Sequence, residues 1–143
     1  MPFQVLYIED DPLDVRLMQE AMSASSIPHE FTSASDGASG LARIRAGALA
    51  VPPWCPNVVV CDLHMPGVNG HDFLRELKAD SSLRHVPVII LSSTESEFEI
   101  SLCYELHANS VVRKPSSFEE LRAVAQCISE FWLATAVLPR QAA

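Results

Sequence analysis

Short runs of apolar residues alternate along the chain with segments in which apolar residues recur every three or four positions. The runs predict buried strands, because the strands of a parallel sheet that is covered on both faces are apolar along their whole length. The recurring segments predict amphipathic helices packed against such a sheet. Five strands are expected, at Phe3–Ile8, at residues 29–32 as a weak edge strand, at Val58–Asp62, and at residues 86–91 and 111–112.

The predicted helices follow the strands. Pro12 suits the first turn of the first helix, and Ser116 or Ser117 is expected to cap the last one. Alternation of five strands with five helices is typical of an α/β doubly wound sheet. Trp54 and Cys55, in a connector at residues 48–56, are expected to pack over the bottom of the sheet. The apolar repeats that predict the helices are Leu13, Leu17, Met18 and Ala21; Ala38, Leu41, Ala42 and Ile44; Phe73, Leu74 and Leu77; Phe98, Leu102 and Leu106; and Leu121, Val124, Ala125, Ile128 and Trp132.

Composition narrows the classes of protein to which the chain can belong. Its 143 residues are 48% hydrophobic, enough for one domain with a proper core. With 18 Asp and Glu against 10 Lys and Arg, the net charge of -8 has the wrong sign for binding nucleic acid or an anionic membrane. No apolar stretch approaches the roughly 20 residues of a membrane helix, and no signal peptide is visible, so we expect a cytoplasmic protein. The four scattered cysteines are expected to be free thiols, as is usual in that compartment.

Two of the predicted strands run directly into acids. Glu9, Asp10 and Asp11 follow the first strand, and Asp62 ends the third. Right-handed crossovers bring the carboxyl ends of all strands in such a sheet to one edge, where ligands collect. Taken singly, Asp62 could cap the next turn, and the three adjacent acids could form a solvated turn. Taken together, the strand ends predict one cluster of side chains, made of Glu9, Asp10, Asp62, Ser92 and Lys114.

This cluster suggests phosphoryl chemistry. Neighbouring carboxylates suit a hard divalent cation, and Mg²⁺ is typically held by one or two of them together with phosphate oxygens. An aspartate can itself attack phosphorus and form an aspartyl phosphate. Lys114 and the Ser92 hydroxyl would then neutralise and hold the phosphoryl oxygens, which is most of what phosphoryl transfer requires. Each strand end thus has a chemical role.

From Phe3 to about Trp132, these residues and their order make the chain resemble the receiver domain of two-component response regulators. The resemblance implies a flavodoxin-like fold with strand order 2-1-3-4-5. It also implies a single receiver domain over residues 1–143, with a short tail after about residue 133 and no output domain. For the site, the resemblance implies that Asp62 is the phospho-acceptor and that Ser92 and Lys114 bind the phosphoryl oxygens. It implies that the Mg²⁺ ligands are the carboxylates of Glu9, Asp10 and Asp62 and the backbone carbonyl of His64. It also implies that the peptide bond before Pro115 is commonly cis.

Two shorter stretches make the resemblance narrower. Residues 9–16 and 131–133 resemble the single-domain regulators that accompany bacterial phytochrome kinases. This implies a sensor histidine kinase as phosphoryl donor, with a bacterial phytochrome as one candidate, and signalling through phosphorylation-dependent contact with a partner protein. The chain departs from many receivers by carrying Val111 in place of an aromatic residue. In the family, the aromatic side chain swings inward as the hydroxyl loop closes on the phosphate. Valine is β-branched and stiff, so it cannot report this motion in the same way. Phosphorylation itself should survive the change.

The residues also leave other functions open. The chain could be a scaffold that is never phosphorylated, or a phosphatase with an aspartyl-phosphate intermediate in which His64 acts as general acid. Apolar character that continues beyond the core face of the last predicted helix could extend the core, but it favours a surface patch and a symmetric homodimer. A zinc site is not expected, because the spacing of its candidate ligands fits no standard site. The patch residues are Phe131, Leu133, Val137 and Leu138, and the zinc candidates are Cys55, Cys61, His64 and His71.

Overall fold

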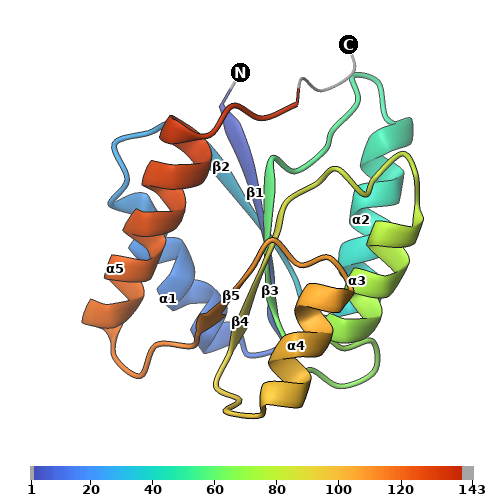
Figure 1. The fold of residues 1–143 in the computed structure, drawn as a ribbon. Coiled ribbons are helices and arrows are strands. Elements are labelled where there is room, and N and C mark those ends of the chain that lie inside the picture. The colour runs from blue at the N-terminus through green and yellow to red at the C-terminus, as the bar shows by residue number, and fades with distance from the viewer. Residues whose placement is uncertain (1, 140–143) are drawn as a thin grey trace.

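The computed structural model describes residues 2–139 and shows a parallel sheet between two layers of helices (Figure 1). Five strands form the sheet: β1 (Phe3–Ile8), β2 (His29–Ala34), β3 (Val58–Asp62), β4 (Val88–Ser92) and β5 (Ser110–Arg113). Their order is β2-β1-β3-β4-β5 and every neighbouring pair is parallel, which confirms the predicted doubly wound fold. β4 begins after Pro87, later than the apolar run predicts, because proline has no N–H to give to a strand ladder.

Five helices cover the sheet: α1 (Pro12–Ser23), α2 (Gly37–Leu49), α3 (Gly70–Ala79), α4 (Glu97–Glu105) and α5 (Phe118–Ile128). Helices α1 and α5 lie on one face, and α2, α3 and α4 lie on the other (Figure 1). A polar side chain at each N-terminus accepts a backbone N–H that the helix leaves unpaired, and in α5 this residue is Ser117. α5 continues directly into a π-helical segment, η1 (Ser129–Thr135).

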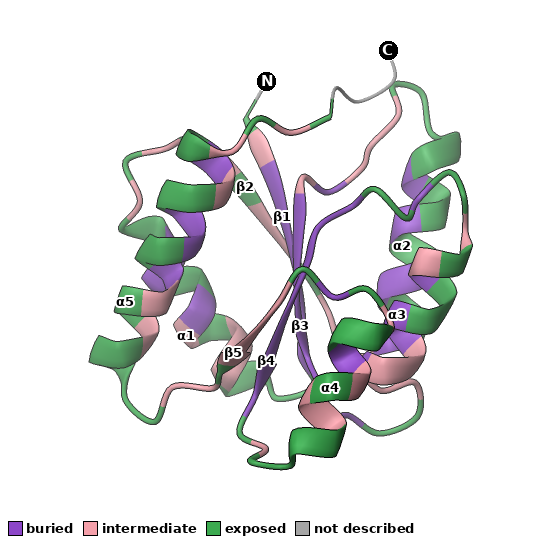
Figure 2. Ribbon diagram, viewed as in Figure 1, coloured by how far each residue is buried: buried purple, intermediate pink, exposed green. Residues whose placement is uncertain are grey.

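The sheet separates two hydrophobic clusters, one under each layer of helices (Figure 2). Side chains alternate along a strand, so β1 sends Leu6 and Ile8 to the cluster under α2 and α3 and Tyr7 to the cluster under α1 and α5. β3 and β4 are buried along their whole length, as predicted for central parallel strands. The core therefore fixes, on both faces, the strands that end at the predicted site.

Within helix α4, the fully buried side chain is not one of those in the predicted apolar repeat, although Leu106 just after the helix packs against the core. Phe98 is exposed, and Leu102 and Leu106 are only half-buried. The side chain that α4 buries is Cys103, which joins the cluster under α2 and α3. Because α4 lies at the end of its layer, against β5 and α3, a narrow strip of its surface meets the core.

The apolar residues near the C-terminus divide between core and surface. Leu133 is 4% exposed and belongs to the cluster under α1 and α5, so its assignment to a surface patch is wrong. Hydrogen bonds in a π-helix join residues five apart, and Leu133 lies five residues after the buried Ile128, so both fall on the inner side of the helix. Phe131 and Val137 are exposed, and Leu138 is half-buried. Residues 140–143 lie outside the described residues.

The connector between α2 and β3 covers the end of the sheet at which the strands begin. The indole N–H of Trp54 donates to the side-chain oxygen of Gln4 at 2.9 Å, and the guanidinium of Arg43 lies 4.1 Å from the ring centre. Trp54 and Cys55 both pack against the core, as predicted. Cys61, Cys103 and Cys127 are free thiols. Within residues 2–139, no helix is long and apolar enough to cross a membrane.

The N-terminal cap of α3 allows a test of local stability. The side-chain oxygen of Asn69 accepts the Asp72 N–H at 3.0 Å, where the loop after β3 enters the helix. We expect Asn69→Ala to lower the free energy of unfolding by about 1 kcal/mol, because the N–H loses its partner. Urea denaturation measures this change. Asn69→Asp keeps an acceptor oxygen and should stay within about 0.5 kcal/mol of wild type, whereas an equal loss in both variants would contradict the capping role.

Candidate functional site

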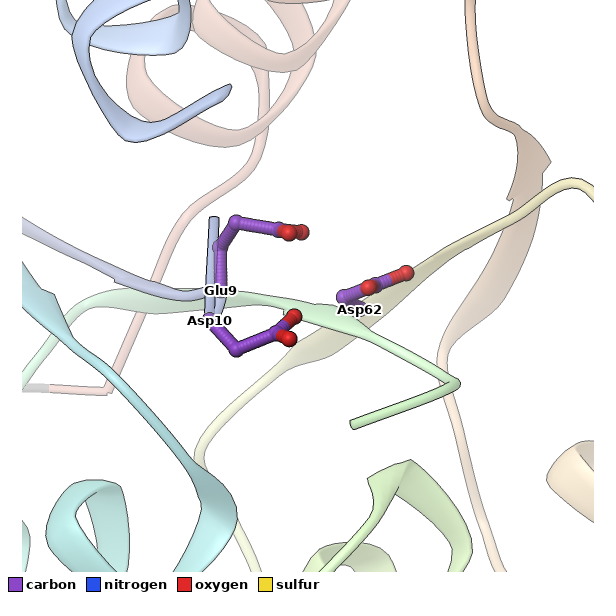
Figure 3. A group of neighbouring side chains, drawn as sticks. All are labelled: Glu9, Asp10 and Asp62. Atoms are coloured by element: carbon purple, nitrogen blue, oxygen red, sulfur yellow. The ribbon is translucent and has the colours of Figure 1, made fainter. Parts of the chain in front are cut away.

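The carboxyl ends of the strands meet at the lower edge of the sheet in Figure 1. Glu9 and Asp10 follow β1, and Asp62 ends the neighbouring strand β3. One carboxylate oxygen from each of these three residues lies within 4.8 Å of those of the other two. Figure 3 shows the carboxylates of Glu9 and Asp10 on the side of Asp62. The three residues, which we call the acid pocket, come together as the sequence predicts.

Lys114 follows β5 and brings its ammonium group to the acid pocket. Its Nζ lies 3.2 Å from Oε2 of Glu9 and 3.6 Å from Oδ2 of Asp62. It also lies 3.1 Å from Oδ2 of Asp14, in the first turn of α1. Asp14 is not among the predicted site residues. No local signal in the sequence identifies it, because an acid in the first turn of a helix is favourable near the helix dipole in any protein.

Burial and the charges of neighbouring acids raise the pKa values of Glu9 and Asp62, the two buried acids of the pocket. The Glu9 side chain is 1% exposed, and burial together with the charge of Asp62 raises its pKa to about 7, although Lys114 acts in the opposite direction. Burial also raises the pKa of Asp62, and Lys114 again opposes the rise. Burial would lower the pKa of Lys114, but the charges of Asp62 and Glu9 outweigh it and raise that pKa. The pocket therefore carries more negative charge than one lysine compensates.

Glu9, Asp10 and Asp11 are adjacent in the sequence, but their hydrogen bonds give them different roles. The backbone N–H of Asp11 donates to Oε1 of Glu9 at 3.2 Å, and the buried hydroxyl of Tyr7 donates to Oε2 at 3.5 Å. Burial and the charge of Glu9 raise the pKa of Tyr7, so this hydroxyl keeps its proton. The Asp11 side chain instead caps α1 by accepting the Leu13 N–H at 2.9 Å. Glu9 and Asp10 therefore belong to the site, and Asp11 has a structural role.

Ser92 ends β4 and is buried beside β3. Asp62 pairs with Leu91 across the two strands, so Ser92 lies one residue farther toward the edge. Its hydroxyl oxygen accepts the Thr94 N–H at 3.0 Å, and its carbonyl accepts the Lys114 N–H at 2.9 Å. These bonds fix Ser92 and Lys114 relative to each other. All five residues predicted from the strand ends thus lie at one edge of the sheet.

The loop after β3 is tied to helix α4. Nε2 of His64 lies 2.9 Å from Oε2 of Glu99, and Nε2 of His71 lies 3.1 Å from the Glu99 carbonyl oxygen. The imidazole that a phosphatase would use as general acid is therefore paired with a glutamate.

Within residues 2–139, the group of side chains placed to hold a metal ion is the acid pocket. The zinc candidates named above form no such group.

Val111 stands where many receivers carry an aromatic residue. It is half-buried in β5, and its N–H donates to the hydroxyl of Tyr104 at 3.0 Å. An aromatic side chain thus contacts this position, but it comes from α4.

The resemblance implies a cis peptide bond before Pro115, and this is wrong for the present structure: within residues 2–139 the cis bond precedes Pro52.

The donor set of the acid pocket suits a hard divalent cation. Mg²⁺ is usually bound through one or two carboxylates and keeps several water ligands. Glu9 and Asp62 are buried, whereas Asp10 is exposed, so the pocket is open to water on one side. A bound cation would offset the repulsion that raises the pKa values of the buried acids. An aspartate nucleophile with a lysine and a hydroxyl beside it is suited to phosphoryl transfer.

Comparisons with known proteins agree with this geometry. The family model of the response regulator receiver domain matches residues 5–126. The chain is 33% identical over 138 residues to response regulator Rcp1 of Synechocystis sp., and the match covers 96% of this chain and 94% of that protein.

Solved structures give the same result. The crystal structure of the phosphorylated cyanobacterial phytochrome response regulator RcpA matches with a TM-score of 0.89 and 34% identity, over 98% of this chain and 100% of RcpA. The Mn²⁺-bound form of Rcp1 matches with a TM-score of 0.87 and 32% identity, over 97% of this chain and 100% of Rcp1.

Proposed function

The chain belongs to the response regulator receiver domain family, and we propose that it is a phosphorylation-switched module in which Asp62 accepts a phosphoryl group from a sensor histidine kinase. It is related to phytochrome response regulators. The observation that carries the proposal is the position of Asp62 in the acid pocket, with Nζ of Lys114 at 3.6 Å. Such an arrangement stabilises the charge on a phosphoryl group during transfer.

In the proposed reaction, a carboxylate oxygen of Asp62 attacks phosphorus. The new O–P bond forms while the bond from phosphorus to the donor nitrogen breaks, and the electron pair stays on the donor histidine. Lys114 can move onto one phosphoryl oxygen, and the Ser92 hydroxyl can donate to another. Mg²⁺, when bound, supplies further positive charge at these oxygens. The groups that would hold it are the carboxylates of Glu9, Asp10 and Asp62 and the backbone carbonyl of His64.

The proposed output is a change of surface. When Ser92 and Lys114 close on the phosphoryl group, the neighbouring loop moves with them and alters what a partner protein can bind. The proposed donor is a sensor histidine kinase, with a bacterial phytochrome as one candidate. RcpA is a phytochrome response regulator, and its similarity over 98% of the chain supports this choice. We also propose a cytoplasmic location, where the chain would meet the donor histidine.

Intact-mass spectrometry tests the proposal. The protein is incubated with a small acyl phosphate, once with Mg²⁺ and once with EDTA. We expect a single phosphoryl adduct with Mg²⁺ that decays slowly, and no adduct with EDTA. Absence of the adduct under both conditions would favour a scaffold that is never phosphorylated. Steady hydrolysis of a phosphomonoester would favour a phosphatase.

We further propose a symmetric homodimer through the C-terminal surface. The exposed ring of Phe131 packs edge-to-face against Trp132, with 5.0 Å between the ring centres. Exposed aromatic side chains are frequent anchors of protein interfaces.

Phe131→Ser should weaken this dimer about fivefold or more, because an anchor of this kind contributes at least about 1 kcal/mol to binding. Light scattering over a concentration series measures the change. Val51→Ser, which removes an exposed apolar side chain from the connector, is the control and should leave the dimer intact. A wild-type protein that stays monomeric at every concentration would contradict the proposed dimer.

A further inference from the structure

The ammonium group of Lys114 has three carboxylate neighbours, and one of them lies outside the acid pocket. The distances from Nζ are 3.1 Å to Asp14, 3.2 Å to Glu9 and 3.6 Å to Asp62. The Asp14 side chain is 32% exposed, whereas those of Glu9 and Asp62 are 1% and 9% exposed. Lys114 is therefore shared between two buried acids and one partly solvated acid on helix α1.

The position of this ammonium group determines how much negative charge is left for a cation. A lysine drawn fully between Glu9 and Asp62 would neutralise the carboxylates that a divalent cation needs. Asp14 offers the ammonium group a counter-ion on the solvent side. The Lys114 side chain is itself partly exposed, so its position depends on these ion pairs more than on packing.

Helix α1 is anchored in a way that fixes Asp14 relative to the pocket. Asp11 caps α1, and its backbone N–H also bonds to Glu9. The first turn of α1, which carries Asp14, therefore moves together with the loop that carries Glu9 and Asp10.

We propose that Asp14 is a positioning residue: it holds the Lys114 ammonium group at the outer rim of the acid pocket and so keeps Glu9 and Asp62 available to Mg²⁺. This inference rests on the proposed function, because it assigns Asp14 to the cation site of the same pocket. Asp14 acts through Lys114 and does not need to contact the cation.

Replacing Asp14 should move Lys114 inward. In Asp14→Asn, the carboxylates left beside the ammonium group are Glu9 and Asp62, so the lysine competes with Mg²⁺ for them. We expect the affinity for Mg²⁺ to fall about fivefold, which is the size of coupling typical of groups in contact. Calorimetric titration of the unphosphorylated protein with MgCl₂ measures this change. Asp14→Glu restores a carboxylate and should recover most of the affinity.

A double-mutant cycle separates this role from a simple loss of charge. Removing any acid near the pocket weakens the attraction for a cation, whether or not Lys114 is present. If Asp14 acts through Lys114, then Asp14→Asn should change the affinity by less than about twofold in the Lys114→Gln background. Glu119→Gln, which removes an exposed acid from the first turn of α5, is the matched charge control and should also change it by less than about twofold.

Two results would overturn the inference. One is an equal loss of affinity from Asp14→Asn with and without Lys114, which would mean a general effect of charge. The other is no loss when Lys114 is present. Both leave the proposed function intact, because the wild-type protein still binds Mg²⁺. Failure of the wild-type protein to bind Mg²⁺ would instead contradict the proposed function itself, and the inference with it.

Discussion

Asp62→Asn should abolish the phosphoryl adduct that forms from an acyl phosphate in the presence of Mg²⁺. The substitution keeps the size of the side chain but replaces the anionic oxygen that attacks phosphorus with an amide. Asp62 ends a strand that is buried along its whole length, so a change that preserves shape should leave the fold intact. Intact-mass spectra of wild type and variant, recorded side by side, give the comparison. We expect a complete loss of the adduct.

Asp36→Asn is the matched control for this experiment. Asp36 caps α2 by accepting the Ser39 N–H at 2.7 Å, and it lies outside the acid pocket. Because asparagine retains an acceptor oxygen, this variant should be phosphorylated like wild type. Labelling that persists in Asp62→Asn would mean that another carboxylate is the acceptor. Asp10 would then be the first candidate, since it lies in the same pocket and is exposed.

Glu9→Gln should stabilise the metal-free protein at alkaline pH while removing its binding of Mg²⁺. Burial and the charge of Asp62 raise the pKa of Glu9 to about 7 in the folded protein, from an ordinary value of 4.5. The folded state therefore holds this proton more tightly than the unfolded chain does. The stabilisation from the proton is complete below a pH of about 4.5 and is lost as the pH rises to about 7. Above that pH, wild type carries a buried charge that glutamine lacks.

The free energy of unfolding of Glu9→Gln should exceed that of wild type by on the order of 2 kcal/mol at about pH 8 in EDTA. The difference should shrink toward zero at about pH 5, where Glu9 is mostly protonated. Denaturant titrations at both pH values measure it. Added Mg²⁺ should stabilise wild type but not the variant, because the cation binds the folded state.

Glu20→Gln, which changes an exposed acid on α1, controls for the loss of one charge. It should stay within about 0.5 kcal/mol of wild type at both pH values. A Glu9→Gln protein that is less stable than wild type at about pH 8 would contradict the repulsion described for the acid pocket.

The residues at the strand ends could be predicted because a parallel sheet leaves little freedom at its carboxyl edge. Once β1, β3 and β4 are recognised as strands, right-handed crossovers bring Glu9, Asp62 and Ser92 to the same place. The strand order could not be obtained in this way, because several orders fit the same alternation of strands and helices. It came from the resemblance to receivers, and the structure confirms it.

The contact of Asp14 with Lys114 is less visible in the sequence. An acid in the first turn of a helix is favourable near the helix dipole in any protein, so its presence does not indicate a site. The contact depends on how α1 is rotated about its own axis and on a lysine that is distant in the sequence. The pattern of residues in and around α1 determines neither the rotation of the helix nor the position of the lysine.

The burial of Leu133 and the exposure of Phe98 have separate causes. A period of 3.6 residues does not anticipate the π-helical winding of η1, which turns Leu133 inward. In α4, apolar residues recur at helical spacing, yet the helix lies at the end of its layer and turns Cys103 toward the core. Apolar spacing predicts that a helix forms, but the position of that helix in the layer determines how much of it is buried.

Helix α4 is joined to the protein by little apolar surface. Its nine residues bury one side chain, that of Cys103, whereas α2 and α3 each bury several. The contacts of Glu99 with His64 and His71 link it to the chain that follows β3. Elements with few buried apolar contacts open locally at a lower free energy than the core does. We therefore expect α4 to open locally at a lower free energy than α2 or α3, while the rest of the domain stays packed.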